Sequence, residues 1–497
     1  MQTFLNDDDF LGLLRVIEVA LHRGQIPPDR MVALRELLSD EFPALEKRMN
    51  RELIKLLVYL QEPTLAPRLI ATLNDAQVPT EEKIHAAMYG RFLQAGWSTD
   101  QKLELLKFFD QSRLLPGGHS FKGYLDNASR DFVGTLSPEE QFAVLRRGRE
   151  FPNAALSALS KLAENPGPDM INLLVGLDRT LLGMQGEAVS RLGTGIVAVL
   201  GGSRNPVAMA YLREVFDQQP ERRQETAMGL AQDPTGENWP VLLRALPVVE
   251  GAAAKEVITH LAAVDQAPDK PEPVRQVILA GLKLKQNGGK DAVQLLEKWT
   301  GQKVSKDDEK WDVALAAWQG WFGEKFPDQP PANLPAESAT SKWTYEDLSK
   351  FLASSDGANG SPERGSLIFT KAQCVKCHRY GAKGEGVGPD LTNVSRRFQR
   401  KEILESVLYP SQVISDQYAS KTVVTNDGLT FMGIVGPAGQ GSIVVLQPTG
   451  EKKVIPESDI SEIVPNPKSA MPEGLFNELT LEEVADLLSF LNQPPSN

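Results

Sequence analysis

Both cysteines of this 497-residue chain fall in one short segment, Cys374-Val375-Lys376-Cys377-His378. A chain with only these two thiols has no disulfide framework, so its fold depends on packing or on a bound group. C-x-x-C-H is the pattern that attaches haem covalently: both thiols add to the haem vinyl groups, and the histidine binds the iron from one side. The segment therefore predicts one covalent haem c held by Cys374, Cys377 and His378.

Three alternative roles for the cysteines fit less well. A thioredoxin-like redox pair needs a βαβ context, and the surrounding sequence shows none. A structural zinc site needs four ligands, but Cys374, Cys377 and His378 cannot readily bind one tetrahedral ion together, and there is no second Cys/His cluster in the sequence. A disulfide between the two cysteines stays open, although it gives His378 no role.

Residues 1–324 have the periodicity of consecutive helices. Capping-box patterns at 98–101 and 137–140 mark helix starts, and apolar residues then recur three and four positions apart. Residues 271–278 resemble the second helix of a HEAT repeat, at an irregular period of about 35–45 residues. We therefore predict a mainly α fold whose N-terminal region is an α-solenoid-like (HEAT-like) stack, with an irregular helical bundle as the alternative.

The polar and aromatic residues of this region have ordinary structural roles. Trp311 and Trp318 lie seven positions apart, on one helical face, which predicts a packed aromatic core; a docking surface for another domain is the alternative. The histidines have no neighbours at metal-ligand spacing, and we interpret them as surface or core residues. They are His22, His85, His119 and His260.

The composition changes after the helical region. Residues 325–360 contain a proline-rich stretch and a short helix at about 344–353, which predicts a linker. A further domain then covers residues 361–497. Between about residues 418 and 464 of this domain, the spacing of apolar residues changes to the alternation that is typical of β-strands, with a hairpin turn at 426–428. We therefore expect a β-insert of about four strands.

Helices frame the motif on both sides. A short helix over 364–369 precedes it, and the chain ends in a helix whose residues Thr480 and Glu483 form a capping box. This pattern resembles the class I cytochrome c fold, in which the first and last helices cross. The resemblance implies that Gly365 and Phe369 on the first helix meet Phe490 on the last.

The residues after the motif leave few candidates for the sixth iron ligand. No histidine comes after His378, and only two methionines do, Met432 and Met471. Met432 lies in a strand-like segment and Met471 in the loop before the last helix. Class I cytochromes place their axial methionine in that loop, so the resemblance favours Met471, with Met432 as a core residue of the sheet. A thioether ligand raises the reduction potential, which suits electron transfer.

The segment Gly388-Pro389-Asp390-Leu391-Thr392 is similar to the loop that comes after the haem motif in class I cytochromes. In that family a proline carbonyl accepts the ring N–H of the proximal histidine. The resemblance therefore implies that Pro389 fixes the orientation of His378 and tunes the iron through it. A simple turn is the alternative.

Taken together, residues 361–497 resemble the haem-binding cytochrome c domain of the Planctomycetes–Verrucomicrobia group. In that family HEAT-like helices often precede the domain, and a β-propeller with a signal peptide often precedes those helices. This chain begins with acidic residues that we assign to a helix at 7–23, and it shows no export signal. Because haem is attached covalently outside the cytoplasm, we expect a periplasmic protein, and we interpret the sequence as the C-terminal part of a longer exported chain or the product of a mis-started gene.

The charge and hydropathy of the chain exclude several partners. A net charge of −12 and a pI of about 5.2 argue against nucleic acid, and no apolar stretch reaches transmembrane length. No catalytic constellation is visible. We therefore predict an electron-transfer module that receives electrons from a redox partner protein or an upstream dehydrogenase domain. The alternatives are a C-terminal fragment of a haem-linked sugar or alcohol dehydrogenase and a haem-based sensor.

Overall fold

The computed structural model is mainly helical, with two antiparallel sheets in its C-terminal part: a two-stranded one of β1 (Arg379–Tyr380) and β2 (Lys383–Gly384), and a five-stranded one. It describes residues 5–118, 120–162, 165–306, 309–335 and 341–493. Two compact units are present, Met1–Ser203 (unit 1) and Arg204–Asn497 (unit 2). The predicted helical fold class with a β-insert is thus confirmed, whereas the solenoid arrangement of the helices stays a prediction.

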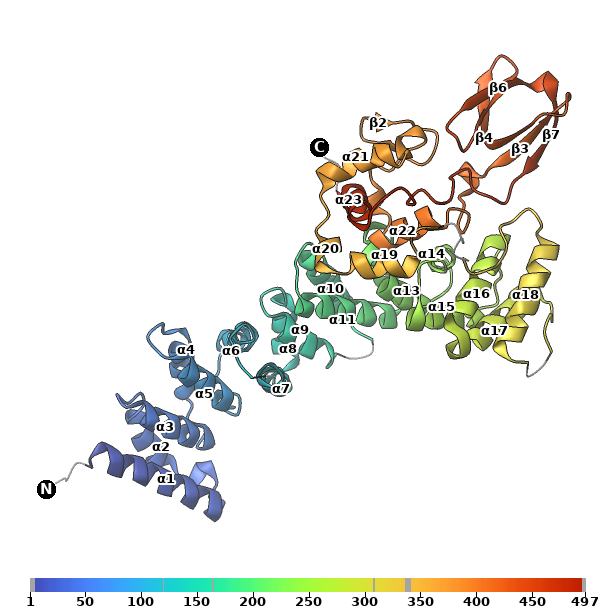
Figure 1. Cartoon of the computed structure of the whole chain (residues 1–497). Coiled ribbons are helices and arrows are strands. Elements are labelled where there is room, and N and C mark those ends of the chain that lie inside the picture. The colour runs from blue at the N-terminus through green and yellow to red at the C-terminus, as the bar shows by residue number, and fades with distance from the viewer. Residues whose placement is uncertain (1–4, 119, 163–164, 307–308, 336–340, 494–497) are drawn as a thin grey trace. The chain divides into compact units, whose positions relative to one another are not determined.

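Unit 1 is built from helices joined by short loops, drawn from blue to green in Figure 1. Both predicted capping boxes are present: Ser98 and Gln101 begin one helix, and Ser137 and Glu140 begin another. Alternate helices pack against one another, which gives the rows α1–α3–α5 and α7–α9–α11. The helices are α1 (Asp7–Gly24), α2 (Val32–Asp40), α3 (Lys47–Tyr59), α4 (Leu65–Asn74), α5 (Thr80–Gly90), α6 (Thr99–Ser112), α7 (Phe121–Val133), α8 (Pro138–Arg146), α9 (Pro152–Leu159), α10 (Pro168–Leu181) and α11 (Glu187–Ser203).

A half-buried carboxyl in unit 1 predicts a pH dependence of stability. Asp110 on α6 accepts a hydrogen bond from the backbone N–H of Asn153 (3.1 Å), and burial raises its pKa from 3.8 to about 6. Between about pH 4 and pH 6 the folded state holds a proton that the unfolded state has lost, so stability falls as the pH rises through this window and is level above it. Asp110→Asn keeps a side-chain oxygen that can accept the hydrogen bond but cannot titrate. We therefore expect the free energy of unfolding of this variant to fall by roughly 1–3 kcal/mol less across the window. Urea unfolding of both chains from pH 4 to pH 7 measures the difference; parallel pH profiles would contradict it.

Unit 2 begins with a second set of helices that pack in the same way, with the row α13–α15–α17. Trp318 on the last of them is fully buried, and its ring lies 5.1 Å from that of Trp321. The aromatic-core interpretation therefore holds for Trp318, whereas Trp311 at the start of the same helix is only half-buried. These helices are α12 (Pro206–Gln218), α13 (Arg223–Ala231), α14 (Asn238–Ala245), α15 (Gly251–Ala263), α16 (Pro271–Leu284), α17 (Gly289–Thr300) and α18 (Trp311–Lys325).

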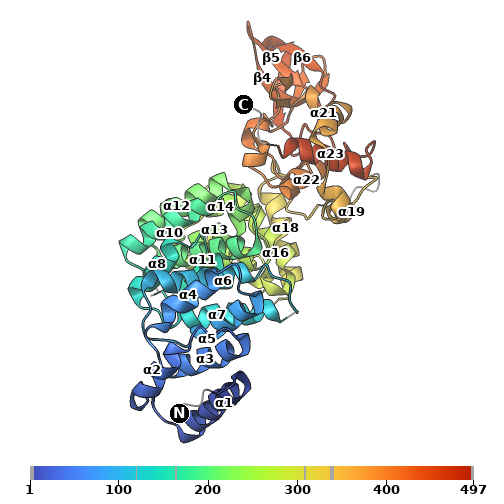
Figure 2. The same ribbon diagram turned by 90° about the vertical axis from the view of Figure 1, so that its left-hand side faces the viewer.

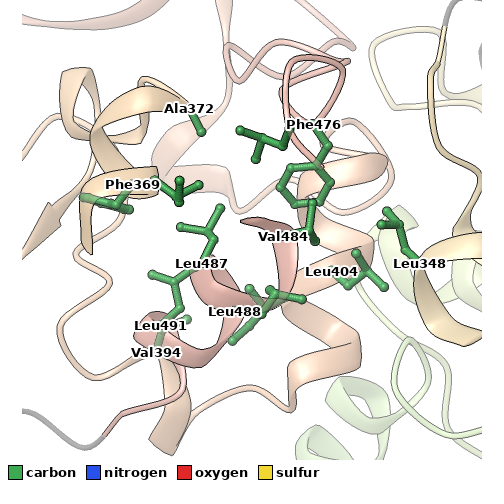
Figure 3. Close-up of a cluster of buried hydrophobic side chains, with 13 residues drawn as sticks. Leu348, Phe369, Ala372, Val394, Leu404, Phe476, Val484, Leu487, Leu488 and Leu491 are labelled. Carbon is green, nitrogen blue, oxygen red and sulfur yellow. The ribbon is translucent and has the colours of Figure 1, made fainter. Parts of the chain in front are cut away.

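The rest of unit 2 contains a smaller set of helices around its own apolar core. Figure 3 shows this core, in which Phe369, Phe476 and Leu487 are among the buried side chains. All of these helices except α20, together with their flanking loops, contribute residues to it, so the core joins segments more than 100 residues apart in the sequence. The helices are α19 (Tyr345–Leu352), α20 (Ser355–Ala358), α21 (Pro362–Lys371), α22 (Arg400–Leu408) and α23 (Leu481–Leu491).

Helices α21 and α23 cross in close contact (Figure 1 and Figure 2). A Cβ atom at Gly365 would lie 2.0 Å from the backbone oxygen of Asp486, so only glycine allows this approach. The rings of Phe369 and Phe490 lie 5.7 Å apart, and Tyr380 stacks against Phe490 at 4.3 Å. The crossing that the class I resemblance implies for Gly365, Phe369 and Phe490 is present.

A buried acid strengthens the crossing. Asp486 on α23 is 4% exposed, accepts from the backbone N–H of Ser361 (2.6 Å) and pairs with Arg364 (2.6 Å). A buried carboxylate needs such partners, because an unpaired charge is costly away from water. Asp486 thus ties the start of α21 to the middle of α23, a role that the sequence alone did not indicate.

The β-insert has five strands, one more than predicted. They are β3 (Lys421–Thr425), β4 (Thr430–Gly439), β5 (Ser442–Leu446), β6 (Lys452–Pro456) and β7 (Ile460–Pro465), in the order β6-β5-β4-β3-β7. The fifth strand, β7, returns to pair antiparallel with β3, where Val423 lies opposite Ile463. The sequence does not indicate this strand, because a strand of mostly exposed residues shows little alternation of apolar and polar residues. A small core of Val423, Ile443, Val445 and Ile455 holds the sheet together.

Helix α22 lies against the first helices of unit 2. Glu402 pairs with Arg223 of α13 (3.2 Å), and Lys401 pairs with Glu250 (2.6 Å). Burial raises the pKa of Glu402 despite its cationic partner, so this pair is largely withdrawn from water. The core around α21 and α23 is therefore attached to the helices that precede it through side chains of α22.

Candidate haem site

The cysteines and the histidine of the motif lie on one tight turn. Helix α21 ends at Lys371, Gln373 takes a left-handed backbone (φ 63°), and a turn of 3-10 helix comes next over Cys374–Lys376. The N–H groups of Cys377 and His378 both donate to the carbonyl of Cys374, at 3.2 and 2.9 Å. Both cysteines are free thiols, so the disulfide alternative finds no support. Burial raises the pKa of the Cys374 thiol to about 11.

The imidazole of His378 is oriented by one hydrogen bond. Its Nδ1 lies 2.8 Å from the carbonyl oxygen of Pro389. A carbonyl can only accept, so Nδ1 carries the proton and Nε2 keeps its lone pair free for a metal. Burial lowers the pKa of His378, and the bond to Pro389 opposes this effect, so the ring is neutral at physiological pH. A neutral, oriented imidazole is the form in which histidine ligates iron.

The loop after the motif closes tightly around the histidine. At Gly388 a Cβ would crowd the ring of His378, since it would lie 3.1 Å from two of the ring atoms. At Gly384 (φ 91°) a Cβ would lie 2.2 Å from the backbone oxygen of His378. The N–H of Gly388 also donates to Cys377 (2.7 Å). Glycine at both positions is therefore what allows residues 384–389 to hold the imidazole.

The donor set fits a covalent haem. Two free thiols and an imidazole with an open Nε2 lie within one turn, and Cys374 and Val375 pack against the apolar core together with Leu391 and Phe398. A haem needs such an apolar wall beside its attachment point. Within the ranges that the structure describes, no three His, Cys, Asp or Glu side chains are grouped so as to hold a metal ion. His22, His85 and His260 fall in those ranges, and His119 lies outside them.

The two candidate axial methionines occupy different settings. Met471 lies in the loop between β7 and α23; it is half-buried, and its N–H donates to Ser469 Oγ (3.1 Å). Met432 lies in the middle of β4, opposite Thr422 of β3. A methionine within a hydrogen-bonded ladder is fixed by the sheet, whereas one in a loop can be presented to a metal. Ligation by Met471 stays a prediction.

The β-insert reaches the attachment turn, which the sequence analysis did not foresee. Gly450, in the turn between β5 and β6, lies close to Lys376: a Cβ atom there would meet the lysine side chain at 3.2 Å. Lys452 pairs with Glu385 in the loop after the motif (3.2 Å). The turn at 448–451 is visible in the sequence, but its contact with Lys376 joins residues more than 70 positions apart.

Residues 362–430 match the Cytochrome c family. This cytochrome c domain suggests a c-type haem electron-transfer module with covalently bound haem and a redox partner. The matched residues begin with α21 and include both cysteines, His378 and Pro389, and they end where β4 begins. Met471 and α23 lie beyond them. A search of curated proteins gives no match.

The β-insert begins within the matched residues and continues beyond them. Strands β4 to β7 separate α22 from the loop of Met471 and from α23, yet α23 still crosses α21 as the cytochrome c fold requires. As for membranes, the helices of the described ranges are all too short or too polar to span one.

Proposed function

We propose that the chain is a periplasmic c-type cytochrome that carries one haem c and transfers single electrons. In this proposal Cys374 and Cys377 bind the haem through thioether bonds, His378 is the proximal ligand and Met471 the sixth. The bound haem would supply a metal that cycles between the ferric and ferrous states. The chain would receive electrons from a dehydrogenase, either a partner protein or a domain upstream of residue 1, in a protein of the Planctomycetes–Verrucomicrobia type.

One observation carries the proposal: the Nδ1 of His378 lies 2.8 Å from the Pro389 carbonyl, next to two unpaired thiols on the same turn. This bond leaves Nε2 as the coordinating atom and makes the imidazole a stronger donor. The chemistry that these residues support is ligation and tuning, with no acid or base poised to act on a substrate. Electron transfer needs no more than that.

A visible spectrum of the full chain, fused to an export signal and made with haem-maturation machinery, tests the proposal. We expect a haem c spectrum and the weak far-red band that methionine ligation gives to ferric haem. Met471→Ala should remove this band and lower the reduction potential by on the order of 0.1 V, within the roughly 0.8 V range that axial ligands span.

Met432→Ala is the matched control, since it removes the other methionine located after the motif. It should keep both the band and the potential. Loss of the band in Met432→Ala alone would move the sixth ligand to the sheet. Covalent haem without any such band in the unsubstituted chain would favour an open site, and therefore sensing or catalysis. If no covalent haem forms, the proposed function is wrong.

A further inference from the structure

The loop of Met471 is linked to helix α16 by a series of hydrogen bonds. The N–H of Met471 donates to Ser469 Oγ, and the N–H of Ser469 donates to Ser411 Oγ, both at 3.1 Å. Ser411 immediately precedes Gln412, whose carbonyl accepts from Arg275 Nη1 of α16 at 2.6 Å. A cation of the helical region thus holds the chain segment on which the Met471 loop rests.

Arg275 is unusual for its burial. It is 1% exposed, and its guanidinium also donates to the carbonyl of Pro331 (3.1 Å) and to Glu272 (3.2 Å). Burying an arginine is costly unless its N–H groups are well paired, and two of the acceptors are backbone carbonyls from segments far apart in the sequence. Arg275 therefore fixes the linker and the segment after α22 to the same helix.

Packing alone does not hold the Met471 loop at this point. A cavity of about 340 Å³ borders it, lined by Glu473 and Gly474 of the loop together with Arg275 and Gln412. Where a cavity replaces packed side chains, position depends on directed contacts. The bonds through Ser411 and Ser469 are such contacts.

We propose that Arg275 is a positioning residue for the axial methionine, acting through Gln412, Ser411 and Ser469 on the backbone of Met471. The inference rests on the proposed function. It gives the helical region a specific role, because this region then sets how firmly the sixth position of the haem is held. Weakening this support favours a form in which Met471 is detached and the ferrous iron is open to a small ligand.

The test consists of two measurements on the full chain. One is the rate at which the reduced form binds carbon monoxide, and the other is the intensity of the far-red band of the oxidised form. Arg275→Leu removes the donor and keeps an apolar side chain in its place. We expect the detached form to gain about tenfold to a hundredfold in population, the range for losing one hydrogen bond to a charged group, with faster carbon monoxide binding and a weaker band. Arg275→Lys, which keeps the charge and one donor, should fall between.

Ser411→Ala breaks the same series one step further along and should reproduce the change, and its effect should not add to that of Arg275→Leu. It also keeps the test open if Arg275→Leu disturbs folding, which circular dichroism would reveal. Lys401→Ala is the matched control: it removes another contact to the preceding helices, the pair with Glu250, and should leave carbon monoxide binding unchanged.

The outcomes separate the two proposals. If Met471→Ala alters carbon monoxide binding but Arg275→Leu and Ser411→Ala do not, the positioning role is wrong and the ligand assignment stands. An equal effect of Lys401→Ala would also overturn the role, because general detachment of the domain would explain it. If Met471→Ala itself changes nothing, the ligand assignment of the proposed function is wrong.

Discussion

Replacing Cys374 and Cys377 with alanine together is expected to abolish haem retention on a denaturing gel completely, while the unsubstituted chain keeps its haem. The thioether bonds need these two sulfur atoms, and the sequence contains no other cysteine that could replace them. Haem-dependent peroxidase staining of the gel measures the result. Haem that survives denaturation in the double variant would contradict the attachment site.

Counting the free thiols of the unfolded chain is a second test of the same prediction. Chain made without haem maturation should show both thiols in denaturant, and chain carrying haem should show none. In the folded haem-free chain Cys374 should react slowly, because burial raises its pKa to about 11 and keeps the thiol protonated at neutral pH. Met471→Ala is the control for this count, since an axial ligand is not needed for the covalent bonds.

The local signals in the sequence predicted the local structure well. Thr480 and Glu483 form the capping box that begins α23, and the turn over Cys374–Lys376 presents the motif as a unit. The resemblance to class I cytochromes added the crossing of α21 and α23. In each case the information lies in residue types at fixed short spacing, which a single sequence displays directly.

The features that the sequence did not predict depend on contacts between distant segments. Nothing in the sequence marks Asp486 as a buried residue, and only the fold supplies Ser361 and Arg364 as its partners. In the sequence Arg275 looks like an ordinary polar residue of a helix, but Gln412, its acceptor, comes 137 positions later. Strand β7 was missed because most of its residues are exposed and show little alternation, and only the fold reveals that it pairs with β3, where Val423 lies opposite Ile463. Hydrophobic periodicity carries no record of such pairings.

Gly365→Val is expected to prevent folding of the cytochrome c domain. A side chain at this position would place its Cβ 2.0 Å from the backbone oxygen of Asp486 and 2.6 Å from the Cβ of Phe490. Backbone atoms of a packed helix cannot move aside, so α21 and α23 would have to separate. Separation exposes Phe369 and breaks the contact that places the attachment turn beside α23.

The expected cost exceeds about 4–5 kcal/mol, which is a large share of the roughly 5–15 kcal/mol by which a native domain is stable. Haem incorporation should therefore fail, and limited proteolysis should cut within residues 341–493 of the variant. Gly320→Val is the matched control, because Gly320 also lies inside a helix of unit 2 and a Cβ there meets no atom within 4 Å. Valine is a better helix former than glycine, so this control should fold and bind haem normally. A Gly365→Val chain that also retains haem and resists the protease would show that the two helices do not cross at this residue.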